Sequence, residues 1–170
     1  MKPTLPLLLS AMALAACLPI PQVVPERLTP RYLGAEPVRV DMNCARTNEF
    51  MFIEGPHSVR LRISPKYFPE NRLAVLQMRL VALGPRPARV ESREVAVVPI
   101  SGGPTRSVPI APAMDAPRKT HDFEARIENL PSGPIRVGLP SIRIDGETWH
   151  PADLELHPMG TTLRPMPFNC

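Results

Sequence analysis

The sequence has 170 residues, of which 24 are proline and 21% are charged, with a formal net charge of +4. This length fits one domain, the even spread of proline argues against a helical bundle, and so mild a charge excludes the basic composition typical of nucleic-acid-binding proteins. Apolar residues make up 44% of the chain and alternate with polar ones in many places, so the composition is not that of a disordered chain.

The first 17 residues have the layout of a secretory signal. Met1-Lys2 is a short basic segment, and an apolar run follows from Leu5 to Leu14. This run is too short to span a bilayer, which takes about 20 apolar residues. At its end, Leu14-Ala15-Ala16-Cys17 resembles the lipobox of bacterial lipoproteins, and all four positions match.

The lipobox resemblance implies that Cys17 carries a diacylglycerol and becomes the new amino terminus. Two or three acyl chains, at about 0.8 kcal/mol per buried methylene, make a stable membrane anchor. In enterobacterial lipoproteins an aspartate after the cysteine favours the inner membrane. Leu18 stands there instead, so we expect outer-membrane attachment, facing the periplasm or the cell surface. Two alternatives stay open: cleavage after Ala13-Leu14-Ala15, which releases a soluble protein, and an uncleaved apolar anchor.

Residues 18–36 are rich in proline and have little periodicity, which predicts an extended tether between the anchor and the domain. In the alternative interpretation, the apolar residues of this segment pack onto the domain. These residues are Val23, Val24, Leu28, Tyr32 and Leu33. Residues 37–170 are then expected to form a single domain.

Period-two alternation predicts strands in the first half of the domain. In the segment from Val38 to Cys44, Val38, Val40, Met42 and Cys44 share the predicted inward face. A short apolar run covers 49–54, and alternation resumes over 57–64 with Arg60 and Arg62 on the outward face. These two arginines are candidates for an anion-binding face, although the solvated side of an antiparallel sheet is the simpler interpretation.

The segment 71–83 fits two kinds of element. Leucines at 73, 76, 80 and 83 have helical spacing, which leaves one short helix at 70–83 as an alternative. However, Leu76, Met78 and Leu80 also alternate with polar residues, and the flanking segments both read as strands. We therefore predict a strand.

Further short strands are predicted at 88–98, 123–127, 135–139, 142–150 and 154–156. Asp145-Gly146 predicts a tight hairpin turn, and the loop 99–119 holds a short edge strand at 107–110. Eight to ten short strands separated by turns predict an all-β fold, an antiparallel β-sandwich of broadly immunoglobulin-like or transthyretin-like architecture.

No catalytic motif or cofactor fingerprint is present in the sequence, so we expect no enzyme and no cofactor. Two weaker patterns remain. His150, Asp153 and His157, with Met159 and Met166, make a candidate metal cluster, although turn or rim residues are the simpler interpretation. The acidic residues of the same region are a candidate catalytic pair, although they are expected to be solvated. These are Asp145, Glu147, Asp153 and Glu155.

The sequence therefore predicts a membrane-anchored, non-catalytic envelope lipoprotein that binds or supports another envelope component. Accessory lipoproteins of secretion or envelope-spanning assemblies are one version of this role, by fold-level analogy. A periplasmic metal or small-ligand binder is the alternative. A hydrolase without a recognisable motif is a third hypothesis, and no nucleic-acid partner is expected.

With Cys17 acylated, the two other cysteines are expected to form a disulfide in the oxidising envelope. Cys44 and Cys170 enclose more than a hundred residues, so the bond is expected to stabilise the fold by up to about 4–5 kcal/mol. Non-reducing peptide mapping should recover the two cysteine peptides as one species. The double serine variant should cost little more stability than either single variant. Costs that sum would show that the two sulfurs act independently.

Overall fold

The computed structural model of the chain describes residues 21–42, 49–113 and 121–165. These residues form strands joined by turns and two single-turn 3-10 helices. The elements are β1 (Pro21–Val24), β2 (Arg27–Tyr32), β3 (Val38–Met42), β4 (Glu49–Glu54), η1 (Pro56–Ser58), β5 (Val59–Phe68), η2 (Pro69–Asn71), β6 (Leu73–Ala82), β7 (Ala88–Val90), β8 (Glu94–Pro99), β9 (Arg106–Pro112), β10 (His121–Ile127), β11 (Ile135–Val137), β12 (Ile142–Ile144), β13 (Glu147–Trp149), β14 (Leu154–Met159) and β15 (Thr162–Pro165).

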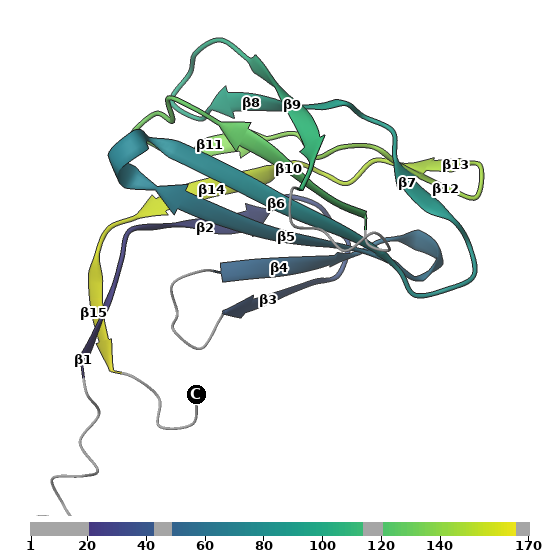
Figure 1. The fold of residues 1–170 in the computed structure, drawn as a ribbon, viewed down its shortest axis with the longest axis horizontal. Coiled ribbons are helices and arrows are strands. Elements are labelled where there is room, and N and C mark those ends of the chain that lie inside the picture. The colour runs from purple at the N-terminus through teal and green to yellow at the C-terminus, as the bar shows by residue number, and fades with distance from the viewer. Residues whose placement is uncertain (1–20, 43–48, 114–120, 166–170) are drawn as a thin grey trace, which may run out of the picture.

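Ten of the strands form one antiparallel sheet, in the order β2-β14-β11-β8-β9-β10-β6-β5-β4-β3. This sheet curls on itself into a nearly closed barrel, and a three-stranded sheet, β13-β12-β7, lies at one end (Figure 1). A two-stranded ribbon of β1 and β15 extends away from the barrel (Figure 1). The prediction of an all-β antiparallel fold is confirmed.

Strand β9 turns the corner between the two halves of the long sheet. Its first part, Arg106–Pro109, pairs with β8, whereas Ile110–Pro112 pairs with β10. The prediction of an edge strand here is therefore wrong, because β9 has a partner on each side. Each half of β9 pairs with one strand only, so half of its backbone groups are not needed for pairing. This pattern tolerates Pro109 and Pro112, which have no N–H group to donate.

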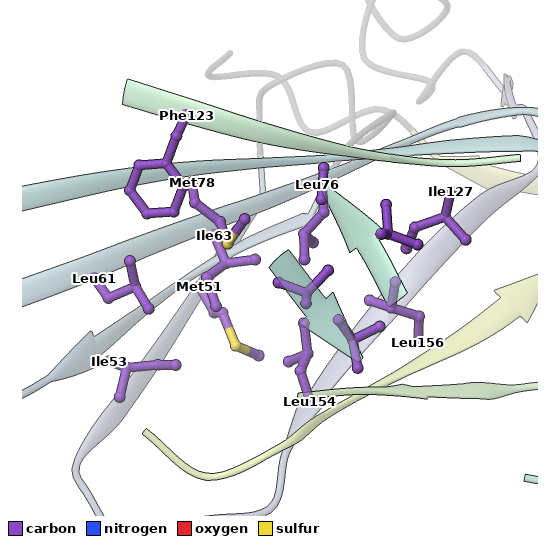
Figure 2. Close-up of a cluster of buried hydrophobic side chains, with 14 of the residues drawn as sticks. Met51, Ile53, Leu61, Ile63, Leu76, Met78, Phe123, Ile127, Leu154 and Leu156 are labelled. Atoms are coloured by element: carbon purple, nitrogen blue, oxygen red, sulfur yellow. The ribbon is translucent and has the colours of Figure 1, made fainter. Parts of the chain in front are cut away.

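The core fills the inside of the curled sheet. Strands β4, β5, β6, β10 and β14 each supply alternate apolar side chains to it, as period-two patterning requires (Figure 2). Twelve large side chains are almost completely buried: Leu28, Met51, Ile53, Leu61, Ile63, Leu76, Ile127, Ile135, Ile142, Ile144, Leu154 and Leu156. Burial of each contributes roughly 1.5–3 kcal/mol before the opposing chain entropy is counted.

The ambiguous segment 71–83 is a strand, as predicted, and the helical alternative is wrong. Only η2 is helical, and β6 then runs for ten residues between β5 and β10. Ala74, Leu76, Met78 and Leu80 face the core. Two flanking strands satisfy the backbone of β6, so the helical spacing of its leucines is overridden by tertiary pairing.

The structure differs from the predicted tether over residues 27–32. These residues form β2, which pairs with β14 over six register positions and buries Leu28. The preceding β1 pairs with β15, with Val24 fully buried and Val23 exposed. The alternative interpretation, in which this segment packs onto the domain, describes it better, because its apolar residues meet β-strand partners distant in sequence.

A buried ion pair lies where the curled sheet comes back on itself. Arg27 on β2 and Glu49 on β4 belong to opposite ends of the strand order, yet Arg27 Nε donates to Glu49 Oε1 at 3.3 Å. The two residues are only 3% and 7% exposed. Arg27 Nη1 is also buried and has no hydrogen-bond partner among the described residues. The pair joins the two ends of the sheet, and its hydrogen bonding is incomplete.

Strand β3 is less buried than predicted. Register places Val38 beside Ile53 and Val40 beside Met51, on the predicted face, but Val38 is 38% exposed and Val40 is 52% exposed. The prediction that they are buried is therefore wrong. As the last strand of the sheet, β3 pairs with β4 alone. No further strand covers it among the residues that the structure describes, which accounts for this exposure.

The predicted hairpin at Asp145-Gly146 is confirmed between β12 and β13. Both residues have positive φ, 47° at Asp145 and 91° at Gly146, as a two-residue type I′ turn requires. Glycine and aspartate are among the few residues that accept this conformation at low cost.

The Arg27–Glu49 pair generates a prediction about stability. Glu49→Gln leaves a buried guanidinium without its counter-charge and is expected to lower the free energy of unfolding by about 3–5 kcal/mol. The double variant Arg27→Met/Glu49→Leu removes both charges and is expected to cost far less, because the native pair is incompletely hydrogen-bonded. Urea unfolding of the wild type, Arg27→Met, Glu49→Leu and the double variant in a double-mutant cycle measures this, with Glu49→Gln as a fifth protein. A double variant that loses as much as the sum of the singles would contradict it.

Candidate functional site

The outer face of the barrel carries one row of charged and aromatic side chains that crosses five strands. Register places Arg39 of β3 beside Phe52 of β4, then Arg62 of β5, Arg79 of β6 and Asp122 of β10. Because successive residues of a strand face opposite ways, the same strands that bury Met51, Ile63 and Met78 must present these side chains outward. We name these five residues the arginine row.

Two phenylalanines form the apolar part of this face. The rings of Phe50 and Phe52 meet edge to face with centroids 5.7 Å apart. The Arg62 guanidinium lies 4.6 Å from the Phe50 centroid, and those of Arg39 and Arg60 lie 5.7 and 5.5 Å from the Phe52 centroid. Cation–π contact of this kind holds the arginines flat against the sheet.

Most of these arginines have an acidic partner. Arg60 pairs with Glu54 at 2.7 Å, and Arg39 pairs with Asp41. Arg79 makes a two-pronged pair with Asp122, with Nε and Nη2 donating at 2.6 and 2.8 Å. These hydrogen bonds raise the pKa of Arg79 above its already high ordinary value. Bidentate pairing of this kind fixes the geometry of both side chains.

Arg62 is the exception. It makes no hydrogen bond and no ion pair with any other residue in the described parts of the chain, and its Nε is buried without a partner. Its cross-strand neighbour is Arg79, so two like charges stand directly opposite each other. Such a juxtaposition is destabilising, and the Asp122 carboxylate offsets the charge of Arg79 but forms no ion pair with Arg62.

A hollow of about 280 Å³ opens beside Arg62 on this face. Its polar lining comes from β5, β6 and β10: Arg62, Ser64, Lys66, Gln77, Arg79 and Asp122. A second hollow of about 400 Å³ adjoins it and shares Lys66 and Gln77. Phe68, Leu73 and Val75 form its apolar side, and Asn71 with the Glu124–Arg126 ion pair forms its polar side. Together the two hollows form a shallow depression with one cationic end and one end of mixed apolar and polar lining.

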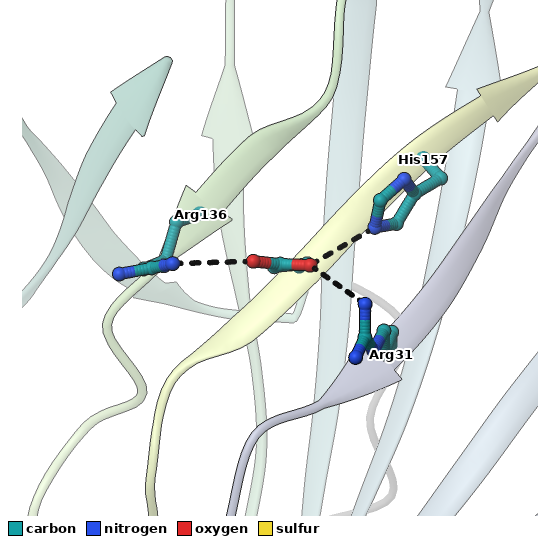
Figure 3. Close-up of polar contacts among 4 residues, drawn as sticks. Arg31, Arg136 and His157 are labelled. Carbon is teal, nitrogen blue, oxygen red and sulfur yellow. Dashed lines mark hydrogen bonds and ion pairs between the residues drawn. The ribbon is translucent and has the colours of Figure 1, made fainter. Parts of the chain in front are cut away.

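A second polar cluster surrounds Glu155 on the outer face of β14. Arg136 of β11 donates to Glu155 Oε1 at 3.2 Å, and His157 Nε2 lies 3.1 Å from Oε2, with Arg31 of β2 at 3.8 Å (Figure 3). These contacts lower the pKa of the Glu155 carboxyl, the hydrogen bond from His157 most of all. The cluster ties three adjacent strands together, and its single carboxylate lies among two arginines and a histidine.

The structure spreads the predicted metal residues over separate surroundings. His157 contacts Glu155, whereas His150 is exposed just after β13 and Met159 is exposed at the end of β14. Met166 lies outside the described residues. Within the described ranges, no group of three histidine, cysteine, aspartate or glutamate side chains is placed to hold a metal ion.

The candidate carboxylates are also kept apart by their partners. Glu147 meets His57 at 3.0 Å and Asp145 lies 3.8 Å from Arg86, both at the β12–β13 hairpin, whereas Glu155 lies on β14. Asp153 is exposed just before β14. The structure therefore pairs three of these four acids with bases, and none of these contacts joins one acid to another.

The predicted lipid and disulfide residues, Cys17, Cys44 and Cys170, lie outside the residues that the structure describes. Of the predicted anion-binding pair, both Arg60 and Arg62 face outward as expected. Sequence reasoning missed Lys66, Arg79 and Asp122. The alternation of polar and apolar residues around them is present in the sequence, but only the pairing register of β5, β6 and β10 brings them beside Arg62.

No family model matches this chain, and no curated protein and no solved structure is found to be similar to it. In the described parts of the chain, no helix has the length and apolar character needed to cross a membrane.

The Glu155 cluster predicts a pH-dependent contribution to stability. A carboxyl whose pKa is lowered on folding stabilises the protein above its ordinary value of 4.5, and this stabilisation is lost as the pH falls through the lowered value. Glu155→Gln is therefore expected to lower the melting temperature by about 2–5 °C at pH 7, and to lower it progressively less below pH 4.5.

Glu94→Gln serves as the control, since Glu94 is exposed and has no ion pair with another described residue. Thermal unfolding of the three proteins from pH 3 to pH 7 (an interval chosen to span the ordinary pKa) makes the comparison. A loss in Glu155→Gln that is the same at every pH would show that the carboxylate charge contributes nothing.

Proposed function

We propose that this chain is a lipid-anchored protein of the bacterial outer membrane, whose barrel binds another envelope component and catalyses no reaction. The observation that carries the proposal is the exposed face around the arginine row, where Arg62 has no acidic partner among the described residues while its neighbours are paired. Cations and half-buried aromatic rings on one rigid sheet are typical of a binding surface.

The position of the first described strand supports the anchored part of the proposal. β1 begins at Pro21, only four residues after Cys17. At about 3.3–3.6 Å per extended residue, these four residues span at most about 14 Å. The ribbon of β1 and β15 then leads directly to the barrel (Figure 1). A lipid on Cys17 would therefore hold the barrel close to the membrane on a paired stalk, in place of a long polyproline linker.

Processing at Cys17 tests the anchor. The wild-type mature protein is expected to begin at Cys17 with added acyl mass and to sediment with outer membranes. Cys17→Ser should stay uncut by the lipoprotein pathway and lose the lipid. An unmodified mature chain beginning at Ala16 would overturn the proposal.

Crosslinking in intact cells tests the binding role. A photoreactive residue is placed at Ser64, inside the cationic hollow, or at Ser132, an exposed turn residue between β10 and β11. We expect an envelope component to be captured from Ser64 and not from Ser132. Equal capture at the two positions, or none at Ser64, would argue against a binding surface on this face.

A further inference from the structure

We propose that the hollow beside Arg62 binds a phosphate monoester group, carried by an envelope compound whose remainder lies along the adjoining hollow. The proposal deepens the proposed function, on which it rests, by naming the chemistry of the bound component. It is argued from charge, hydrogen-bonding capacity and shape in turn.

The charge of the hollow favours an anion. Three cationic side chains line it, Arg62, Lys66 and Arg79, against the one carboxylate of Asp122, so the formal charge is +2. Arg79 donates to both oxygens of Asp122. Arg62 and Lys66 have no ion pair with any residue in the described ranges and are therefore the groups available to a ligand. A phosphate monoester carries about −1.5 to −2 charges near neutral pH, which matches this surplus.

The strand geometry lets both cations reach one anion. Arg62 and Lys66 stand four residues apart on the same face of β5, which separates their Cα atoms by about 13 Å. Both side chains are long, so their charged ends can converge on a group held between them. Ser64 lies midway and faces Gln77 across the β5–β6 pair. Its hydroxyl and the Gln77 amide add neutral donors at the floor of the hollow.

Arg62 supplies the most specific element. Its Nε is buried and has no partner among the described residues, while its ring contact with Phe50 at 4.6 Å holds the guanidinium plane against the sheet. An orphaned, oriented N–H next to surplus positive charge is suited to an oxyanion. A guanidinium offers two parallel donors to a phosphate, which an ammonium group cannot do.

The shape indicates what else the ligand contains. The adjoining hollow of about 400 Å³ meets the cationic end at Lys66 and has an apolar wall of Phe68, Leu73 and Val75. Its charged residues Glu124 and Arg126 pair with each other, which leaves the apolar wall as the surface available to the rest of the ligand. A sugar phosphate and a phosphorylated lipid headgroup both carry the required phosphate, and they differ in how much apolar surface follows it. The two sources are separated by the experiment.

The experiment uses the mature acylated protein in phosphatidylcholine nanodiscs. Calorimetric titrations are made with inorganic phosphate, glucose 1-phosphate and short-chain dihexanoyl phosphatidic acid. We expect saturable binding that Arg62→Gln weakens at least tenfold, the loss of about one charge-assisted bidentate contact. Arg62→Lys keeps the positive charge but loses the two parallel N–H donors of the guanidinium, so its affinity for phosphate should lie between those of the wild type and Arg62→Gln. Tighter binding of phosphatidic acid identifies a lipid source, and tighter binding of glucose 1-phosphate a sugar source.

Arg136→Gln is the matched control, because Arg136 is also an outward arginine but pairs with Glu155 on other strands. It should leave phosphate binding unchanged. Thermal unfolding of Arg62→Gln should show no loss of stability, since the substitution removes an unpaired buried donor and a like-charge neighbour.

Three results would overturn the phosphate site: no saturable binding of any probe below about 10 mM, no effect of Arg62→Gln, or an equal loss in Arg136→Gln, which would indicate general charge attraction. Each is distinguishable from failure of the proposed function. A protein that is acylated at Cys17 and crosslinks from Ser64, yet binds no phosphate, keeps the envelope-binding role and loses only this ligand class.

Discussion

The fold depends on bringing the two ends of a ten-stranded sheet together. Backbone hydrogen bonds join neighbours in the strand order, but the meeting of β2 with β4 relies on side chains. Leu28 supplies apolar contact there, and the Arg27–Glu49 pair supplies a buried charge contact. A buried ion pair is a poor source of net stability, but it is selective about geometry. At this position the ion pair favours one alignment of the two sheet ends over a slipped or open sheet. Its incomplete hydrogen bonding indicates that it contributes little net stability, so selecting this alignment is its main effect.

Curling the sheet also determines what the outer face can do. Once apolar residues are turned inward on every strand, the outward residues form rows perpendicular to the strands, and their neighbours are fixed by register. In the arginine row this places Arg62 between Phe52 and Arg79, where it forms no ion pair with a carboxylate of the described ranges. By the same rule, Glu155 lies between Arg31 and Arg136 and is fully compensated. The arginine row therefore has a positive charge, on Arg62, that is available to a ligand, whereas the charge of Glu155 is already paired within the chain.

Patterning in the sequence was enough to predict the strands, since Leu61, Ile63, Phe123 and Ile127 lie on the faces their alternation predicts. It failed where a residue's surroundings depend on distant partners. β2 contains Pro30 and lies in a proline-rich segment with little periodicity, so it does not read as a strand, and only pairing with β14 makes it one. Val38 and Val40 alternate correctly but lie on an edge. The candidate site was half visible for the same reason: Arg60 and Arg62 follow from alternation, whereas Lys66 and Arg79 join them only through curvature and register.

The direct passage from β1 into β2 has a mechanical consequence. Only Pro25 and Glu26 separate the stalk from the first strand of the barrel. Tension between a membrane-held amino terminus and a partner bound to the barrel would therefore run along β2. Because β2 lies antiparallel to β14 over six register positions, this load acts along the strand axis and strains their hydrogen bonds together, rather than opening them one at a time. Under the proposed anchoring, the pairing of β2 with β14 would therefore resist pulling from the amino terminus.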